Sequence, residues 1–600
     1  MNHANVRFRW VISFILPLVA VIAFVASLAC LVSFTVYIGY DHTATEFQTL
    51  KRVIRVAQII FIANVALPLI FDFRRVVAEN RPIKWIVDVA VLLTFLPLVY
   101  PMPAHPWIPL LKTILYSNHF LFPVLAAYSV VDICYGIMRM MGRRVNPSLM
   151  LSASFLVFIL IGSFLLMLPK CTYGGGISYV ESLFVSTSAV CITGLTPVDV
   201  YVNFTPLGLL VLAVLIQIGG LGVLTFTSFF ALFFAGNTSI YSQMIVRDLV
   251  YSKTMNSLIP TLLYIFCFTL TLEAAGAVWI FFCIHGQLGL TLDDEIMTAC
   301  FNSLSAFCNA GFSNIPMGMA NPSLLFGNQS IYWAMSCLTI LGSIGFPILV
   351  NYRDMIVKQF RLFWHRLRHR RVLERAVHLA DMNTKIVITA FGLLFIFGAV
   401  SFLVLEWDNT LAPFDLWGKV SQAVFNSTTP RSSGFVSVDP ARFLSPTLII
   451  VMFLMWIGGA AQSTGGGIKV NTFAAVCMNL RSIIRGQQTV NAFGRSISLV
   501  SLRRANAVVA LSIISYALYS FTILLLEPDL PVKDLLFETA SALFTVGSSL
   551  GVTSELSPAS LVVLSTAMFI GRVGIISLLT GLVRQSPTGL RLPSGNIIIN

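Results

Sequence analysis

Four short turns along the chain carry backbone groups that could bind a cation. They read VCITGLTPVD (190–199), AFCNAGFSN (306–314), TPRSSGFVSVD (429–439) and FTVGSSLGVT (544–553). Glycine adopts conformations that turn successive carbonyl oxygens toward one axis. Stacked rings of such oxygens can replace the hydration shell of a monovalent cation. Four turns around one axis would therefore form a cation pathway lined mainly by backbone.

The segments that must position these turns also recur. The glycines of the turns are separated by 117, 123 and 113 residues and are Gly194, Gly311, Gly434 and Gly547. Each follows a half-apolar stretch of about 11–13 residues, too short to span a bilayer and suited to a re-entrant helix, near 180–190, 295–307, 415–427 and 534–544. The negative C-terminal end of each short helix faces its turn and favours a cation. A single glycine could serve helix packing alone, but four in register favour a pore.

The composition places these segments in a membrane. Hydrophobic residues make up 57% of the 600 residues and charged residues 10%, whereas soluble domains carry about 25% charge. The sequence therefore predicts an integral membrane protein rather than a set of soluble domains. About twelve apolar stretches could span about 30 Å of hydrocarbon, near 11–39, 53–72, 85–101, 115–138, 149–168, 204–234, 260–285, 329–350, 384–405, 446–475, 505–526 and 559–583.

The net charge of +13 comes mostly from basic clusters between these stretches. In a soluble protein it would favour nucleic-acid binding; here the positive-inside rule explains it and predicts that both termini are cytoplasmic. The clusters are Arg7/Arg9, Arg74 to Lys84, Arg139 to Arg144, Arg353 to Arg375, Arg481 to Arg504 and Arg584/Arg591. The run HRLRHRRVLER (365–375) is either a solvated cytoplasmic helix or a docking surface for a soluble partner or acidic lipid head groups.

The repeated segments resemble the Trk/Ktr/HKT superfamily of potassium transporters, in particular their TrkH/KtrB-type potassium-translocating subunits. SAVCITGLTPVD (188–199) and STTPRSSGFVSVD (427–439) match the filter pattern of that superfamily. Further motifs follow the turns, at IQIGGLG (216–222), LGSIGFP (341–347), IGGAAQSTGGGIK (457–469) and MFIGRVG (568–574). The resemblance covers about 150–585, and six ordered motifs make it specific.

The expected fold is an all-α integral membrane protein with four pseudo-repeats of helix, pore loop and helix around a central ion pathway, plus about four extra N-terminal transmembrane helices. The expected boundaries are 1–147 for the accessory helices, 148–258 for pore repeat 1, 259–383 for repeat 2 with a basic linker, 384–504 for repeat 3 with the gate loop, and 505–600 for repeat 4 with the C-terminal tail. The accessory helices faintly resemble a voltage-sensor bundle, with Asp72 and Asp88. Their fourth helix offers only Lys112 and His119 as positive charges, so a scaffold is the better prediction.

The resemblance implies a selectivity filter for potassium, because a glycine in all four turns accompanies potassium selectivity in this superfamily. Its sodium-preferring plant members have a serine in the first turn. The implied potassium-binding residues are Cys191, Ile192, Thr193, Gly194, Cys308, Asn309, Ala310, Gly311, Ser432, Ser433, Gly434, Thr545, Val546 and Gly547.

The resemblance also implies a flexible gate loop at Gly458–Lys469. Five glycines in twelve residues cannot form a continuous lipid-facing helix. Members commonly have Ser-Pro-Gly where this chain has Ala460-Ala461-Gln462, which leaves the shape of the loop open. A phosphate-binding loop is the alternative for GGGIK, but it lacks GK[ST] and a preceding strand. The implied gate residues are Gly458, Gly459, Gln462, Ser463, Thr464, Gly465, Gly466, Gly467, Lys469 and Arg572.

Two cationic side chains are expected near this gate. Arg572, in the middle of an apolar stretch, is either a hydrogen-bonding partner for pore-loop carbonyls or, by resemblance, an electrostatic barrier beside the gate loop. Lys469 could do either, or could reach toward the cytoplasm.

Other charged residues near the turns also have two possible roles. Glu181 and Glu538 are expected at the starts of the short helices, to complement the helix dipole or attract cations. Asp199 and Asp439 would line the same outer mouth, and Arg431 would brace the filter. Glu273 is an intramembrane carboxylate that could couple transport to protons or sodium, or could be a paired structural group.

The predicted function is potassium uptake across a bacterial cytoplasmic (inner) membrane. By resemblance, the protein would be a homodimer on separate cytoplasmic TrkA/KtrA-type regulatory subunits that bind ATP/ADP or NAD(H), with 353–375 and 481–504 as docking candidates. A sodium- or proton-coupled symporter and a sodium-conducting relative remain alternatives. No cofactor, nucleic-acid partner or catalytic constellation is expected, which argues against a membrane-embedded enzyme.

Overall fold

The computed structural model describes residues 14–71, 73, 76–77, 82–100, 116–141, 147–174, 176–222, 258–367 and 382–582. This part of the chain is helical apart from one short hairpin, whose strands are β1 (Asn491–Ala492) and β2 (Arg495–Ser496). Several predicted features lie outside the described residues: Arg7/Arg9, Asp72, Arg74/Arg75, Arg81, Lys112, Arg143/Arg144, most of the run 365–375, and Arg584/Arg591.

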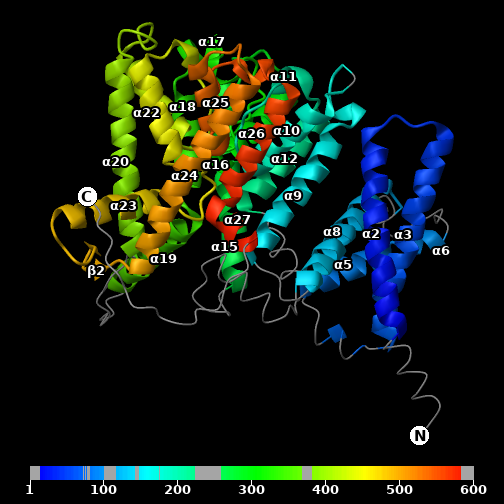
Figure 1. The fold of residues 1–600 in the computed structure, drawn as a ribbon. Helices are drawn as coiled ribbons and strands as arrows, with labels where there is room; N and C mark the ends of the chain where they lie inside the picture. The colour runs from blue at the N-terminus through cyan, green and yellow to red at the C-terminus, as the bar shows by residue number, and fades with distance from the viewer. Residues whose placement is uncertain are drawn as a thin grey trace.

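The N-terminal helices form a separate group at one side of the molecule (Figure 1). They are α2 (Leu16–Gly39), α3 (Ala44–Phe71), α5 (Pro82–Leu93), α6 (Leu96–Val99) and α8 (Asn118–Met141). Their apolar faces enclose a core of their own that includes Phe34, Phe61 and Leu125. An ion pair of 2.8 Å between Asp41 and Lys170 links this group to the rest of the chain.

The four short segments expected before the turns are all helices. They are α10 (Tyr179–Cys191), α16 (Leu292–Cys308), α21 (Leu416–Thr428) and α25 (Val532–Leu543). Side chains of Ser178, Thr291 and Asp415 accept hydrogen bonds from the first turns of α10, α16 and α21, which sets where each helix begins. At 17 residues, α16 is longer than expected because its acidic start, 293–295, adds a turn.

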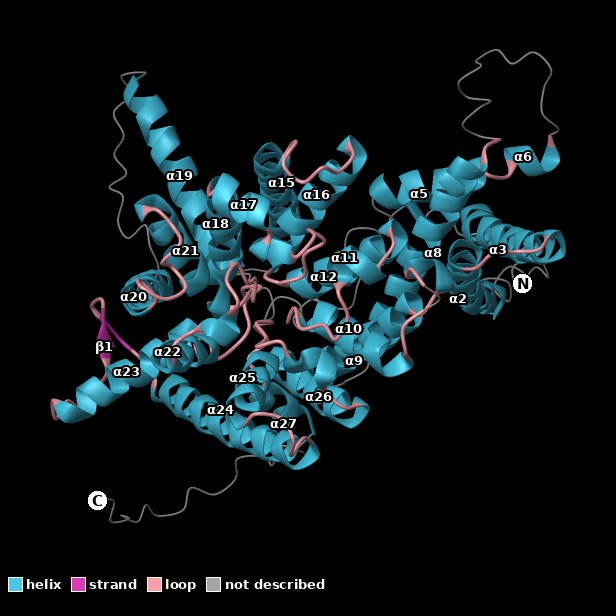
Figure 2. Ribbon diagram, turned by 90° about the horizontal axis from the view of Figure 1, so that it is seen from above, coloured by secondary structure: helices cyan, strands magenta, loops and turns pink. Residues whose placement is uncertain are grey.

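A longer helix precedes each short helix, and a further helix follows it. The preceding helices are α9 (Pro147–Leu166), α15 (Leu258–Ile284), α20 (Met382–Leu405) and α24 (Leu499–Leu526). Those that follow are α12 (Pro206–Leu221), α18 (Ser330–Ile344), α22 (Ser445–Trp456) and α26 (Pro558–Val573). Short elements at the loops are η2 (Pro169–Cys171), α11 (Val200–Asn203), η4 (Gly318–Ala320), α17 (Pro322–Gly327), η5 (Thr429–Arg431), η6 (Pro440–Arg442) and η7 (Val552–Glu555). Seen from above, the helices surround a centre where their loops meet (Figure 2).

Within residues 258–582, two of the stretches expected to be single spanning helices are instead broken. The stretch 329–350 is divided between α18 and α19 (Phe346–Leu367), with a bend of 95°, and 559–583 between α26 and α27 (Ile575–Leu582). Both breaks fall at motif glycines, Gly345 and Gly574, whose φ angles are 97° and 86°. Because side chains strongly disfavour this left-handed backbone region, glycine permits the break. The predicted break in 446–475 lies between α22 and α23 (Val470–Ile484).

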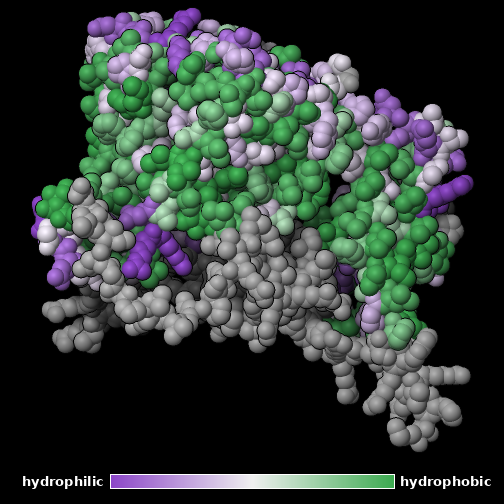
Figure 3. All heavy atoms as spheres, viewed as in Figure 1, coloured by the Kyte–Doolittle hydropathy of each residue, from purple (hydrophilic) through white to green (hydrophobic). Residues whose placement is uncertain are grey.

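Five helices in the described part of the chain are long and apolar enough to span a membrane without interruption. They are α2, α3, α20, α24 and, within α15, Leu263–Ile284. This is fewer than the twelve expected stretches, because several of those break at glycines or continue into residues that are not described. Hydrophobic side chains dominate the flank of the molecule, with hydrophilic ones along the upper rim (Figure 3). The chain is thus a helical, multi-pass membrane protein.

Candidate functional site

The four glycine turns meet and form a closed ring. Each key glycine lies against the carbonyl group just before the key glycine of another turn. The contacts run from Gly194 to Ala310, Gly311 to Ser433, Gly434 to Val546 and Gly547 to Thr193, in sequence order. A Cβ atom at Gly194 would lie 2.6 Å from the carbonyl oxygen of Ala310, so a larger residue would displace that carbonyl. The ring therefore needs glycine at these positions and brings four sets of backbone carbonyls together.

Three of the turns share one backbone design. Ile192, Asn309 and Thr545, each two residues before its glycine, have φ angles of 56°, 59° and 50°. Ser188 and Ser541, six residues before Gly194 and Gly547, accept hydrogen bonds from the amides of those glycines at 2.9 and 3.0 Å.

These serines are not among the residues predicted from the sequence. The recurrent spacing of serine six residues before glycine, which Ser305 and Gly311 also share, could have revealed them.

The third turn is built differently. Thr428 stands where the other turns have serine, and a turn of 3-10 helix, η5, follows α21. The carbonyl oxygen of Thr429 accepts hydrogen bonds from the amides of Ser432, Ser433 and Gly434 at 3.0–3.2 Å. The ring is therefore asymmetric in backbone structure although its four glycine contacts are equivalent.

Arg431 leads away from the ring toward α20. Its side chain is 2% exposed, stacks on the ring of Phe391 and donates a hydrogen bond to the Phe391 carbonyl oxygen at 3.1 Å. These contacts anchor the third turn to the preceding long helix.

Polar side chains in three of the short helices, α16, α21 and α25, hold the chain that leaves the turn. Asn426 donates to Ser437 at 2.9 Å, and Asn302 accepts from Ser313 at 2.8 Å. After the fourth turn, the fully buried Glu538 plays the same part and accepts hydrogen bonds from Ser549 and Thr553. Glu538 was expected at the start of its helix, but α25 begins at Val532. The expectation was wrong because α25 begins directly after Pro531, which leaves Glu538 in the middle of the helix.

The remaining acidic residues expected at the mouth begin helices. Glu181 and Ser178 form a reciprocal capping box, with Ser178 N donating to Glu181 at 2.8 Å. Asp199 accepts from the amides of Tyr201 and Val202, and Asp439 from that of Ala441. The observed hydrogen bonds of these three carboxylates therefore serve local structure.

The loop Gly458–Lys469 lies against the ring. Asn309 Nδ2 donates to Thr464 Oγ1 at 2.6 Å, and Gly466 N donates to Ser432 Oγ at 3.1 Å. A Cβ atom at Gly466 would clash with the carbonyl oxygen of Phe544, so the loop also touches the fourth turn. It thereby contacts three of the four turns directly.

The break between α18 and α19 holds the same loop. Ala460 N donates to Ser343 O at 2.8 Å, and Phe346 N donates to Gln462 O at 3.1 Å. The non-helical backbone at the break and that of the loop therefore pair their hydrogen-bonding groups with one another, as buried backbone requires.

Two cationic side chains bind carbonyl oxygens of the loop. Arg572 donates to Thr464 O at 2.7 Å and to Gly219 O at 2.9 Å, and so joins α26, the loop and α12. Lys469 donates to Gly465 O at 2.5 Å and so turns back onto its own loop. The hydrogen-bonding role considered for Arg572 is therefore present, with loop and helix carbonyls as its partners.

Glu273 lies behind the second turn. It is 8% exposed, and its Oε1 is 3.7 Å from Cys308 Sγ, which in turn lies 3.8 Å from Oε1 of Gln217. A buried carboxyl group is thus in contact with the thiol of a residue in the second turn.

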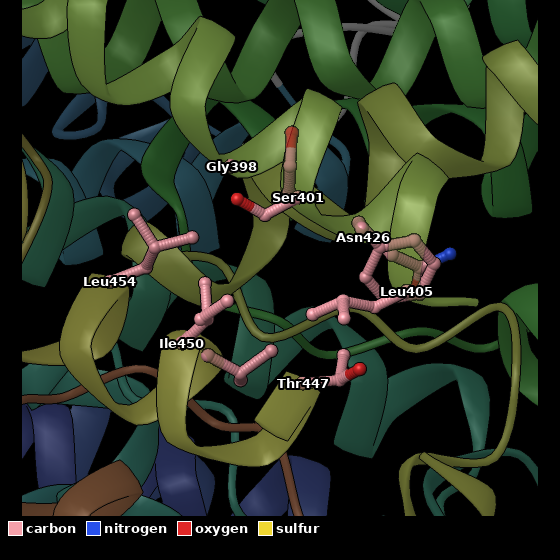
Figure 4. A pocket seen from close by; sticks show the side chains of 10 residues that line it. Gly398, Ser401, Leu405, Asn426, Thr447, Ile450 and Leu454 are labelled. Atoms are coloured by element: carbon pink, nitrogen blue, oxygen red, sulfur yellow. The ribbon is translucent and has the colours of Figure 1, made fainter. Parts of the chain in front are cut away.

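A small cavity lies beside the third short helix, between α20, α21 and α22 (Figure 4). Its lining includes Ser401, Asn426 and Thr447, and its volume of about 10 Å³ admits on the order of one water molecule. It offers no room for a larger ligand.

Known proteins resemble this chain over most of its length. A family model named TrkH and described as a cation transport protein matches residues 141–590. Ktr system potassium uptake protein B of Vibrio alginolyticus is 32% identical over 452 residues, which cover 74% of this chain and 93% of that protein. Potassium/sodium uptake protein NtpJ of Enterococcus hirae is 29% identical over 468 residues, covering 76% and 98%.

A solved structure resembles the fold. The potassium transporter TrkH from Vibrio parahaemolyticus aligns with a TM-score of 0.57, covering 84% of this chain and 99% of that chain, at 17% sequence identity. At this identity the likeness concerns the fold alone.

Proposed function

This chain belongs to the TrkH family of cation transport proteins, and from that premise we propose that it takes up potassium through the ring of four turns. It is a transporter of the Trk/Ktr type and not an enzyme. The observation that carries the proposal is the ring itself, in which each key glycine lies against a carbonyl of another turn. Backbone carbonyls in such an arrangement supply the ligands that replace water around potassium.

In this proposal the residues at and just before the four glycines form the selectivity filter. Their carbonyl groups would bind the ion, and the hydrogen bonds of Ser188 and Ser541 would hold the glycine amides away from it. The asymmetric third turn would supply the same backbone ligands, through Ser432, Ser433 and Gly434.

The loop Gly458–Lys469 acts as the gate. Its hydrogen bonds to Asn309 and Ser432 support a position across the pathway directly at the filter. The bonds from Arg572 to Thr464 O and Gly219 O hold the closed position. Opening requires these bonds to break, and the cationic Arg572 also opposes entry of a cation while the loop is in place.

The wider assembly follows from the same proposal. The chain would work as a homodimer in a bacterial inner membrane, with both termini cytoplasmic and with TrkA/KtrA-type nucleotide-binding subunits below it. Residues 353–375 and 481–504 would receive those subunits. The boundaries 148–258, 259–383, 384–504 and 505–600 would delimit the four pore repeats, with 1–147 as an accessory scaffold.

A sodium- or proton-coupled symporter is the second candidate. The observation that favours it is the carboxyl group of Glu273, 3.7 Å from the side chain of Cys308 in the second turn. A coupled mechanism predicts that rubidium uptake follows an imposed sodium or proton gradient and that Glu273→Gln abolishes this dependence. A sodium-conducting pore predicts equal competition by sodium and potassium.

The decisive experiment is rubidium flux into liposomes that contain the purified chain, with potassium, sodium or lithium as competitors. Block by potassium alone is expected, and equal block by sodium would contradict the filter assignment. If no flux is seen, deletion of Gly465–Gly467 distinguishes a closed gate, which the deletion opens, from a chain without a pore. The Gly194→Ser variant, which should lose discrimination against sodium, serves as the filter control.

A further inference from the structure

A cavity of about 270 Å³ lies beside the gate loop, between α24 and the break that separates α26 from α27. One water molecule requires on the order of 10–15 Å³ of such space, so this cavity is large enough for a ligand of many atoms. Most of its wall is apolar, formed by side chains such as those of Val508, Phe544, Ile570 and Ile575. A cavity of this size and lining accommodates an alkyl chain rather than a compact polar ligand.

Two half-buried cations lie at the gate-loop side of this cavity. Lys469 and Arg572 both line it, and both donate hydrogen bonds to backbone carbonyl oxygens. Across the residues that the structure describes, neither side chain forms an ion pair with a carboxylate. Carbonyl dipoles compensate a partly buried cation less fully than an opposite charge does. The cavity therefore combines an apolar wall with an excess of positive charge at one end.

We propose that this cavity binds an anionic amphiphile whose acidic head contacts Lys469 and Arg572 and whose alkyl chain lies along α24 and α26. A free fatty acid and an acidic membrane phospholipid share this chemistry. An acidic head would compete with Thr464 O and Gly465 O for the two cations, and so weaken the bonds that hold the loop. This consequence rests on the proposed function of the loop as the gate, whereas the binding itself does not.

The test is direct binding of labelled oleate to the full chain in nanodiscs of neutral phosphatidylcholine, which needs no ion flux. Oleyl alcohol, of equal length without charge, is the matched ligand control. Val508→Trp fills the cavity from α24 without removing a gate-loop hydrogen bond. Ile514→Trp adds the same side chain to α24 at a position 61% exposed and is the matched protein control. Phosphatidylglycerol added as a competitor separates the two sources of the ligand.

Saturable oleate binding is expected, weakened about tenfold or more by Val508→Trp and by Lys469→Gln but not by Ile514→Trp. If phosphatidylglycerol competes with oleate, the occupant is a membrane lipid. If phosphatidylglycerol does not compete, the occupant is a free fatty acid. Equal binding of oleyl alcohol, or unchanged binding in Val508→Trp, would overturn the proposal. Rubidium flux then tests the consequence: oleate should raise flux in the parent chain and not in Val508→Trp. Binding without a change in flux would contradict the gate function and leave the site in place.

Discussion

Asn309 and Thr464 are 155 residues apart in the sequence, yet the Asn309 amide donates a 2.6 Å hydrogen bond to the Thr464 hydroxyl. Asn309 belongs to the second turn of the ring and Thr464 to the loop across it. The Thr464 hydroxyl also donates a hydrogen bond of 3.2 Å to Phe307 O. The backbone carbonyl oxygen of Thr464 accepts a hydrogen bond of 2.7 Å from Arg572. The ring and the loop are therefore one hydrogen-bonded unit, and movement of the loop must alter the partners of Asn309 in the ring.

Replacing Thr464 with valine should uncouple the loop from the ring. The substitution keeps the shape of the side chain and removes the hydroxyl that pairs with Asn309, which leaves a buried amide without this partner at a cost of about 1–3 kcal/mol. Basal rubidium flux should rise and discrimination against sodium should fall. Thr464→Ser keeps the hydroxyl and is expected to behave like the parent chain. Equal flux in all three proteins would show that this bond does not restrain the loop.

Gly547 and Gly551 offer a matched pair for the ring. Their φ angles are 99° and 98°, so alanine at either position pays a similar backbone penalty of about 1–2 kcal/mol. A Cβ atom at Gly547 would also clash with Thr193 O, whereas none of the surrounding atoms lies within 4 Å at Gly551. Gly547→Ala should therefore lose potassium selectivity in competition flux assays, and Gly551→Ala should retain it. Loss of selectivity in both would assign the effect to backbone strain alone.

Arg572 variants separate charge from hydrogen bonding. Hydrogen bonds from charged groups contribute about 1.5–3 kcal/mol, so loss of one shifts a closed-to-open equilibrium by roughly tenfold or more. Arg572→Gln should raise basal rubidium flux because it removes both the positive charge and the pair of hydrogen bonds to Thr464 O and Gly219 O. Arg572→Lys keeps the charge but cannot reach Thr464 O and Gly219 O with one planar fork. If lysine restores low flux fully, repulsion of the ion and not the two bonds closes the pathway.

Glu538 should stabilise the chain that leaves the fourth turn. Its carboxylate is fully buried and accepts hydrogen bonds from Ser549 and Thr553. Glu538→Ala should therefore lower the free energy of unfolding by about 1–3 kcal/mol. The pair Glu538→Ala and Ser549→Ala forms a double-mutant cycle, read by thermal unfolding in detergent. A coupling of about 0.5–3 kcal/mol is expected. Strict additivity would mean that the two side chains act independently.

Glu406, just beyond the end of α20, should make the stability of the fold depend on pH. Burial raises the pKa of this carboxyl, but hydrogen bonds from Thr447, Leu444 N, Thr410 and Asn409 outweigh burial, so the net pKa is lowered. Its stabilising contribution is therefore complete above the unfolded pKa of about 4.3 and is lost as the pH falls through the lower folded value. Melting curves at neutral and acidic pH should differ more for the parent chain than for Glu406→Gln. An equal difference in both proteins would rule out this carboxyl as the source.

Local chemistry in the sequence was enough to predict the membrane character, the four short helices and the positions of the turns and the loop. Apolar stretches and glycines determine local structure, because hydropathy and φ preference are properties of a segment and its solvent. The same local view missed the breaks at Gly345 and Gly574, since a glycine in an apolar helix is equally compatible with close helix packing. It also placed Glu538 at a helix start, although its partners lie beyond the next turn.

The tertiary structure alone decided which groups meet. The contact of Gly547 with Thr193 O closes the ring between the last turn and the first. Arg572 reaches Gly219, 353 residues away, and Thr464, 108 residues away. An arginine in an apolar stretch must find polar partners, but any buried carbonyl satisfies that demand. The choice among them depends on how four helix pairs pack around a centre, which no single segment contains.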